Sequence, residues 1–125
     1  MKPLKRHTAL IELSRDHHHS LSLCVRILRT PSESHQSEIE PHMVELEHHF
    51  SEEERQLAPY WNHIDTALRA RFEDDHARLR TMMAAPRYTD EAWNTQFATT
   101  LREHARFEER ELFPAWEAHL PPSDA

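Results

Sequence analysis

Residues 49–59 read His-Phe-Ser-Glu-Glu-Glu-Arg-Gln-Leu-Ala-Pro, and residues 104–114 read His-Ala-Arg-Phe-Glu-Glu-Arg-Glu-Leu-Phe-Pro. Both segments follow the pattern His-x-x-x-Glu-Glu-x-x-Leu-x-Pro. Residues four positions apart stand one above the other on the same face of an α-helix. If both segments are helical, each presents a histidine and a carboxylate side by side, as half of a metal-binding site would.

Apolar residues around these segments recur at spacings of three and four, which indicates amphipathic helices. The pattern predicts four helices, over residues 8–29, 37–60, 66–85 and 91–115. The expected N-caps of the first, third and fourth helices are Thr8, Asp65 and Asp90. In the second helix, Pro41 is compatible with the first turn, whereas Pro59 should kink or interrupt the end.

Four helices of about 20 residues joined by short loops favour an all-α fold, an up-down-up-down antiparallel four-helix bundle. The absence of glycine supports this fold, because β-hairpin turns often need the positive φ angles that glycine adopts. The 125 residues suffice for one domain. The expected organisation is a short arm (1–7), the bundle (8–119) and a polar C-terminal tail (120–125).

The composition limits the partners. The formal net charge is −7, and no basic surface stands out, so duplex nucleic acid is not an expected partner. The single cysteine, Cys24, excludes an intrachain disulfide and a thiolate-based zinc or iron–sulfur site. No signal peptide is recognisable, and no apolar run approaches the roughly 20 residues of a membrane span. We therefore expect a soluble cytoplasmic protein, monomeric or homodimeric, without a membrane partner.

Each predicted helix carries one histidine in its apolar stripe, namely His18, His49, His76 and His104. In the first helix this stripe runs through Ile11, Ser14, His18, Leu21, Val25 and Leu28. Glu53 and Glu108 follow one turn after their histidines, and counting from the loops places all six side chains at similar heights in the bundle. Buried polar groups cost several kcal/mol unless they are paired. The sequence therefore predicts two metal ions bridged by Glu53 and Glu108, with the histidines as terminal ligands.

The donor types restrict the metal. Imidazole and carboxylate ligands without thiolate suit iron, manganese or zinc, and bridging carboxylates in a helical bundle favour a dinuclear iron or manganese site. One alternative concerns the first helix, where His17 competes with His18 because one residue turns the helix face by only about 100°. Three neighbouring polar residues are interpreted as solvent-exposed, namely His19, Glu52 and Glu54. His48 is expected to face either solvent or the residues that surround the ligands.

These motifs resemble the hemerythrin-like (HHE cation-binding) family. The resemblance rests on both repeated segments, on Leu-Ser-Arg-Asp-His-His-His-Ser-Leu at residues 13–21, and on Asp75-His76 followed by Leu79. It implies a non-haem di-iron site whose ligands map to His18, His49, Glu53, His76, His104 and Glu108. Members of this family carry dioxygen, sense oxygen, redox state or iron, or handle peroxide or nitric oxide.

The sequence departs from the oxygen-carrying members at two places. Those members have a second histidine on the third helix, four residues before the first, where this chain has Phe72; Glu73 could complete the ligand set instead. They also place the last carboxylate five residues after its histidine, which corresponds to Glu109. We favour Glu108 because it repeats the spacing of the second helix. The missing histidine argues against reversible oxygen carriage.

The resulting prediction is a cytoplasmic di-iron protein that binds or senses dioxygen or a related small oxidant such as peroxide or nitric oxide. Its cofactor would be two non-haem iron ions (Fe2+/Fe3+), with or without an oxo or hydroxo bridge, and manganese or zinc are the lesser alternatives. One alternative function is a di-iron enzyme that consumes peroxide or nitric oxide; another is a metal-free or zinc-bound interaction module. No nucleophilic catalytic arrangement or phosphate-binding glycine loop is present, so the sequence favours a metal- and oxygen-binding protein over a dedicated enzyme.

Overall fold

The computed structural model describes residues 6–121, which are helical without a strand. The elements are η1 (Thr8–Leu10), α1 (Ile11–Arg29), α2 (Gln36–Leu57), η2 (Ala58–His63), α3 (Thr66–Ala84), α4 (Glu91–Phe107), the π-helical turn η3 (Glu108–Leu112) and α5 (Phe113–Glu117). The all-helical prediction is confirmed for this part of the chain. Within it, no helix is long and apolar enough to cross a membrane. The predicted arm (1–7) and tail (120–125) lie partly outside the described residues.

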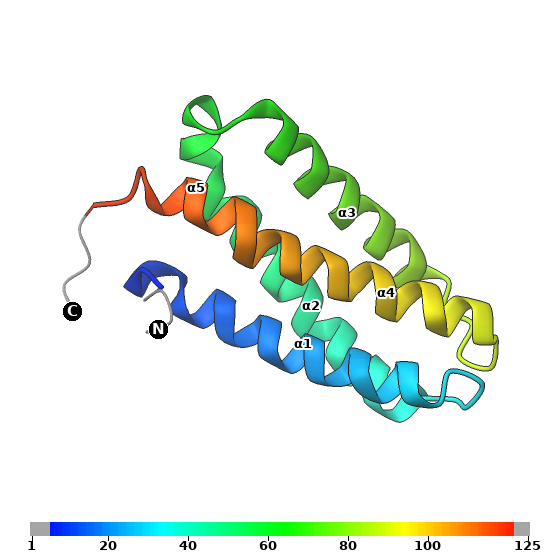
Figure 1. Ribbon diagram of the computed structural model, residues 1–125. Coiled ribbons are helices and arrows are strands. Elements are labelled where there is room, and N and C mark those ends of the chain that lie inside the picture. The colour runs from blue at the N-terminus through cyan, green and yellow to red at the C-terminus, as the bar shows by residue number, and fades with distance from the viewer. Residues whose placement is uncertain (1–5, 122–125) are drawn as a thin grey trace.

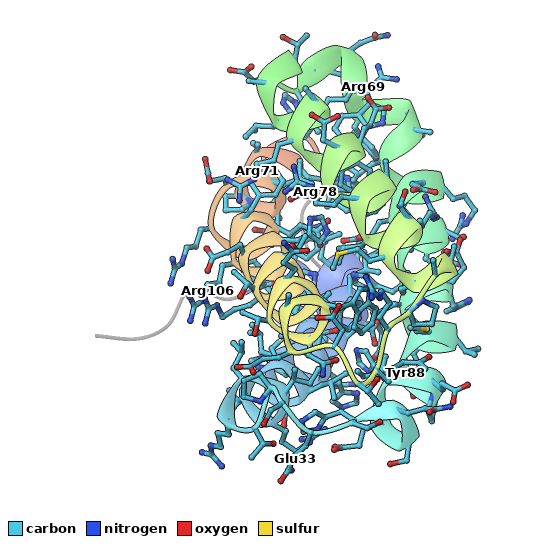
Figure 2. The ribbon with its side chains drawn as sticks, turned by 90° about the vertical axis from the view of Figure 1, so that its right-hand side faces the viewer. Glu33, Arg69, Arg71, Arg78, Tyr88 and Arg106 are labelled. Atoms are coloured by element: carbon cyan, nitrogen blue, oxygen red, sulfur yellow. The ribbon has the colours of Figure 1, made fainter. Side chains whose placement is uncertain are left out.

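The four long helices lie side by side and reverse direction at each connection (Figure 1). This arrangement is consistent with the predicted up-down-up-down antiparallel bundle. The α1–α2 and α3–α4 loops lie at one end of the molecule, and η2 and α5 lie at the other. Figure 2 looks onto the loop end, where Glu33 and Tyr88 mark the two loops. The buried Asn94 side chain joins these loops by donating hydrogen bonds to the carbonyl oxygens of Pro31, Glu33 and Tyr88 at 2.9, 3.2 and 3.0 Å.

The helix starts agree with the predicted caps in two cases out of three. The Asp65 and Asp90 carboxylates accept backbone N–H groups at the starts of α3 and α4, as N-caps do. The prediction for Thr8 is wrong, because the His7 ring accepts the N–H of Ala9 and a 3-10 turn precedes α1. Arg6 is held to the bundle by an ion pair with Glu117 at 2.6 Å.

The two prolines of the second segment act differently from one another. Because α2 begins at Gln36, Pro41 lies in its second turn and not in its first. Pro59 does interrupt the helix: α2 ends at Leu57, and the chain continues as the 3-10 helix η2. The interruption agrees with the loss of a backbone donor and the steric effect of the proline ring.

The apolar core consists of two clusters separated along the bundle. We call the first the loop-end cluster; its buried members are Leu23, Cys24, Ile27, Ile39, Leu46, Phe50, Leu79, Trp93, Phe97, Ala98 and Leu101. The second is the terminal-end cluster, with Leu10, Leu13, Leu57, Ile64, Phe72, Phe107, Leu112, Phe113 and Trp116. Burial raises the pKa of the Cys24 thiol to about 12, so this residue remains a protonated member of the core.

The predicted stripe of the first helix is off by one residue. Val25, which should be buried, is 48% exposed, and Leu13, Cys24 and Ile27 are buried instead. Both stripes contain apolar residues at helical spacing, so periodicity alone does not separate them. The shift decides which histidine of α1 points into the bundle.

Candidate metal centre

A belt of buried polar side chains lies between the two apolar clusters. Each long helix contributes one buried histidine, and two of the helical segments add a glutamate. These inner residues are His17, His49, Glu53, His76, His104 and Glu108, all at most 4% exposed. Ionisable side chains are almost never buried to this degree unless they are paired.

The inner residues form two groups, each compact enough to hold one cation. We call His17, His49, Glu53 and Glu108 the first half-site, and Glu53, His76, His104 and Glu108 the second half-site. In each group one donor atom from every residue lies within 4.8 Å of the others. Both glutamates belong to both groups, so each carboxylate is placed to bridge two ions.

The distances support this bridging role. The Oε1 atom of Glu53 lies 3.2 Å from Nε2 of His49 in one half-site and 3.2 Å from Nε2 of His76 in the other. The two oxygens of Glu108 lie 2.7 Å from Nε2 of His17 and 3.3 Å from Nε2 of His104. Each glutamate therefore faces one imidazole from each half-site.

Unpaired atoms indicate that these residues suit a metal. Nine buried side-chain nitrogen and oxygen atoms in residues 6–121 lack a hydrogen-bond partner, and six of them belong to this cluster. They are Nε2 of His49, His76 and His104, both carboxylate oxygens of Glu53, and Oε2 of Glu108. Unpaired buried polar atoms are costly, and coordination of a cation would satisfy all six together. The donor set therefore fits a pair of ions.

The electrostatics of the cluster also favour cations. Burial opposes charge on His17, but hydrogen bonds to Glu108 and Glu109 outweigh it and raise the pKa of His17 to about 9. Burial is likewise outweighed at His104, where Glu108 and Asp75 raise the pKa to about 10. Protons and metal ions compete for these imidazole nitrogens, because only a neutral imidazole binds a metal.

A second layer of four carboxylates surrounds the inner residues. The Nδ1–H group of each inner histidine donates to a carboxylate on a neighbouring helical segment. The distances are 2.9 Å from His49 to Asp16, 2.9 Å from His76 to Glu54, 2.9 Å from His104 to Asp75 and 2.6 Å from His17 to Glu109. We call Asp16, Glu54, Asp75 and Glu109 the outer carboxylates. Such bonds fix the tautomer of a metal-binding histidine and leave its Nε2 lone pair for the metal.

The outer contacts run in a closed ring through the bundle. The outer carboxylate of α1 accepts a hydrogen bond from the inner histidine of α2, that of α2 from the histidine of α3, and that of α3 from the histidine of α4. The carboxylate of η3, which follows α4, accepts from the histidine of α1 and completes the ring. Each outer carboxylate is adjacent in sequence to an inner residue on the same segment. Arginines pair with three of them: Arg80 with Glu54 at 2.6 Å, Arg6 with Glu109 at 3.3 Å and Arg71 with Asp75 at 3.6 Å. In Figure 2 Arg71 lies on the α4 side of α3.

Replacing Asp75 by alanine is expected to weaken metal binding by about 10- to 100-fold, because the imidazole of His104 loses the partner that orients it. Metal affinity, measured by competition with a chromophoric chelator, checks this expectation. Asp74→Asn is the matched control, since Asp74 is exposed beside Asp75. Asp75→Glu or Asp75→Asn should recover part of the affinity. A uniform loss in all these variants, or no loss in Asp75→Ala, would contradict the role of the ring.

The structure brings most of the predicted ligands together and corrects one. His18 is exposed, and His17 takes the position in the buried cluster that the sequence assigned to His18. The cause is the one-residue shift of the α1 stripe. Glu73 is exposed and lies 3.6 Å from Arg69, away from both half-sites. Glu109 is an outer carboxylate, and Glu108 is the inner one.

Apart from Glu109, the outer carboxylates are not among the predicted site residues, and Glu54, predicted to be solvent-exposed, is half-buried. The signal was present in adjacent acidic and ligand residues: Asp16-His17, Glu53-Glu54, Asp75-His76 and Glu108-Glu109. The repeated Asp-His pair would also have selected His17 over His18. The π turn η3 was missed as well, and such turns are frequent at functional sites.

Comparison with known proteins agrees with this geometry. The sequence matches the hemerythrin HHE cation-binding domain over residues 8–116, which include all four long helices and both layers of the site. No curated protein and no solved structure gives a match. The match covers most of the chain and all the inner residues, so the protein belongs to the hemerythrin HHE cation-binding domain family.

Proposed function

We propose that this protein holds two non-haem iron ions in the cytoplasm and binds or senses dioxygen or a related small oxidant. The observation that carries the proposal is the pair of half-sites that share Glu53 and Glu108. Two imidazoles and two carboxylates per ion are a donor set that suits iron, and four protein donors leave room for an exogenous ligand. The expected exogenous ligand is a small oxidant that binds at the open coordination position.

Bound ferrous ions would supply two electrons, enough to convert one hydrogen peroxide and two protons into two water molecules. The protein residues have separate tasks around that chemistry. Glu53 and Glu108 offset the charge of the ions, and the outer carboxylates hold the Nδ1 protons of the four histidines. The two apolar clusters above and below the belt exclude bulk water, which strengthens every electrostatic interaction inside.

A di-iron enzyme that consumes peroxide or nitric oxide is the second candidate. It is favoured by Phe72, which stands beside His76 at a ring-centroid distance of 4.0 Å and offers no ligand atom. The second ion would then have one histidine ligand fewer than in the oxygen-carrying members, which favours turnover over reversible carriage. A metal-free interaction module is disfavoured because it would leave six buried polar atoms unpaired.

The test is the iron content of the protein after anaerobic reconstitution with ferrous iron and desalting. We expect about two iron ions per chain. We expect near-complete loss in His49→Ala and His104→Ala, because each replacement removes a donor from one half-site and the two ions share Glu53 and Glu108. His48→Ala is the control, since His48 is exposed beside His49. About one ion per chain, preferential loading of zinc, or normal iron in both ligand variants would overturn the proposal.

A further inference from the structure

A groove of about 630 Å³ lies between α2 with η2 on one side and α3 on the other. Its lining includes Ala58, Trp61, Phe72 and the inner ligand His76. The cavity at His49, in the first half-site, measures only about 10 Å³, close to the size of one water molecule. Of these two cavities, the groove beside His76 is therefore the one with room for a small molecule.

Phe72 lies in the wall of this groove, next to the second half-site. Its ring centroid lies 4.0 Å from that of His76 and 6.4 Å from that of His104. On the groove side, the same ring lies 5.2 Å from Trp61. Phe72 is 2% exposed, so its ring is packed into the wall of the groove.

The two half-sites differ because their covering residues differ. Leu13 and Phe72 are equivalent, each four residues before the inner histidine of its helix. Ala58 and Phe113 are also equivalent, each five residues after an inner glutamate. Phe113 is buried and stacks on His17 at a centroid distance of 5.2 Å, whereas Ala58 is exposed.

The π turn η3 explains this difference. In a π turn the residue five positions on, and not the fourth, lies next to the starting residue. The N–H of Phe113 accordingly donates to the carbonyl oxygen of Glu108. α2 has no such turn after Glu53, so Ala58 stays at the surface and the groove stays open beside His76.

We propose that small oxidants reach the metal centre through the groove between α2 and α3, that they arrive at the second half-site, and that Phe72 controls their passage. This inference rests on the proposed function. It assigns different tasks to the two half-sites: the first, covered by Leu13 and Phe113, is closed, and the second is the one that meets the oxidant.

The charges at the groove indicate which oxidants fit. Arg80 pairs with Glu54 at 2.6 Å, and Arg69 lies 3.6 Å from Glu73. Arg69 also lies over the ring of Trp61 at 5.4 Å. Because positive and negative groups are matched, the groove has no field that would concentrate an anion. Small uncharged molecules such as dioxygen, hydrogen peroxide or nitric oxide are therefore the expected class.

The route can be tested without any reaction, by adding xenon to the metal-free protein and recording amide chemical shifts. We expect the largest shifts around Phe72 and His76, and increases of about several-fold in Phe72→Ala, because removal of the ring joins the groove to the second half-site. Shifts centred on Leu13 or His17, or a map unchanged by Phe72→Ala, would overturn the route. This readout does not depend on whether the protein reacts with an oxidant.

Kinetics of the iron-loaded protein provide the second test. We expect hydrogen peroxide to oxidise the ferrous form about tenfold faster in Phe72→Ala and about tenfold slower in Ala58→Trp, which fills the groove at its surface. Leu13→Ala is the matched variant at the first half-site and should change the rate less than Phe72→Ala does. Phe72→Leu replaces Phe72→Ala if the latter loses its metal, and Ala58→Trp alters only an exposed position.

The outcomes separate the two proposals. Failure of the wild-type protein to bind about two irons would refute the function and leave the xenon result standing. Normal iron content with equal rates in wild type and Ala58→Trp, or a larger effect of Leu13→Ala than of Phe72→Ala, would refute the route alone.

Discussion

The His17→Ala variant is expected to lose its bound iron, whereas His18→Ala keeps the wild-type content. His17 is buried between the carboxylates Glu108 and Glu109, with its two ring nitrogens 2.7 and 2.6 Å from them. Removing this ring deletes one donor of the first half-site and one contact of the outer ring. His18 is exposed on α1 and touches neither layer.

Iron per chain, measured by atomic emission after anaerobic loading, distinguishes the two variants. His19→Ala serves as a further control, because His19 is also exposed in the same triplet. Circular dichroism should be helical in all three proteins, which separates loss of metal from loss of fold. Iron loss in His18→Ala together with full loading of His17→Ala would reverse the assignment of the α1 ligand.

The second large effect concerns stability: removing the ions with a chelator should lower the midpoint of thermal unfolding by roughly 15 °C. The figure corresponds to about 4 kcal/mol of binding linkage, the value for a ligand at about 1,000 times its dissociation constant. The physical reason is that removal of the cations leaves two buried glutamates and six unpaired polar atoms in the belt. Differential scanning calorimetry with and without chelator measures the shift.

The control for this experiment is Glu53→Gln, whose amide cannot act as an anionic bridge. Its unfolding midpoint should be the same with and without chelator. Equal midpoints for the wild-type protein in the two conditions would favour the metal-free interaction module instead.

Much of the fold and of the inner site can be predicted from residue spacing. The stripes of α2 and α4 are anchored by His49 and Glu53 and by His104 and Glu108, and a four-residue spacing fixes both side chains on one face. The stripe of α3 is equally well determined, since Phe72, His76 and Leu79 are all buried. These helices have one plausible buried face each.

The first helix is different because its sequence is compatible with two alternative buried faces. Residues Leu21, Val25 and Leu28 make an apolar stripe through His18, and Leu13, Cys24 and Ile27 make another through His17. The two differ by one residue, and helical periodicity does not rank them. What ranks them is contact with other helices, above all the approach of Glu108 and Glu109 to His17. Tertiary contacts of this kind also decide the π turn η3 and the groove beside Ala58.

The two halves of the chain supply equal sets of inner ligands and outer carboxylates. Residues 6–63 supply two inner histidines, one bridging glutamate and two outer carboxylates, and residues 64–121 supply the same set. Each helical hairpin thus provides three of the four donors of one half-site, and the fourth is the glutamate of the opposite hairpin. In engineering terms the domain is a pair of complementary fragments. If the chain were cut between η2 and α3, the two fragments should associate again, and the bound metal ions would hold them together.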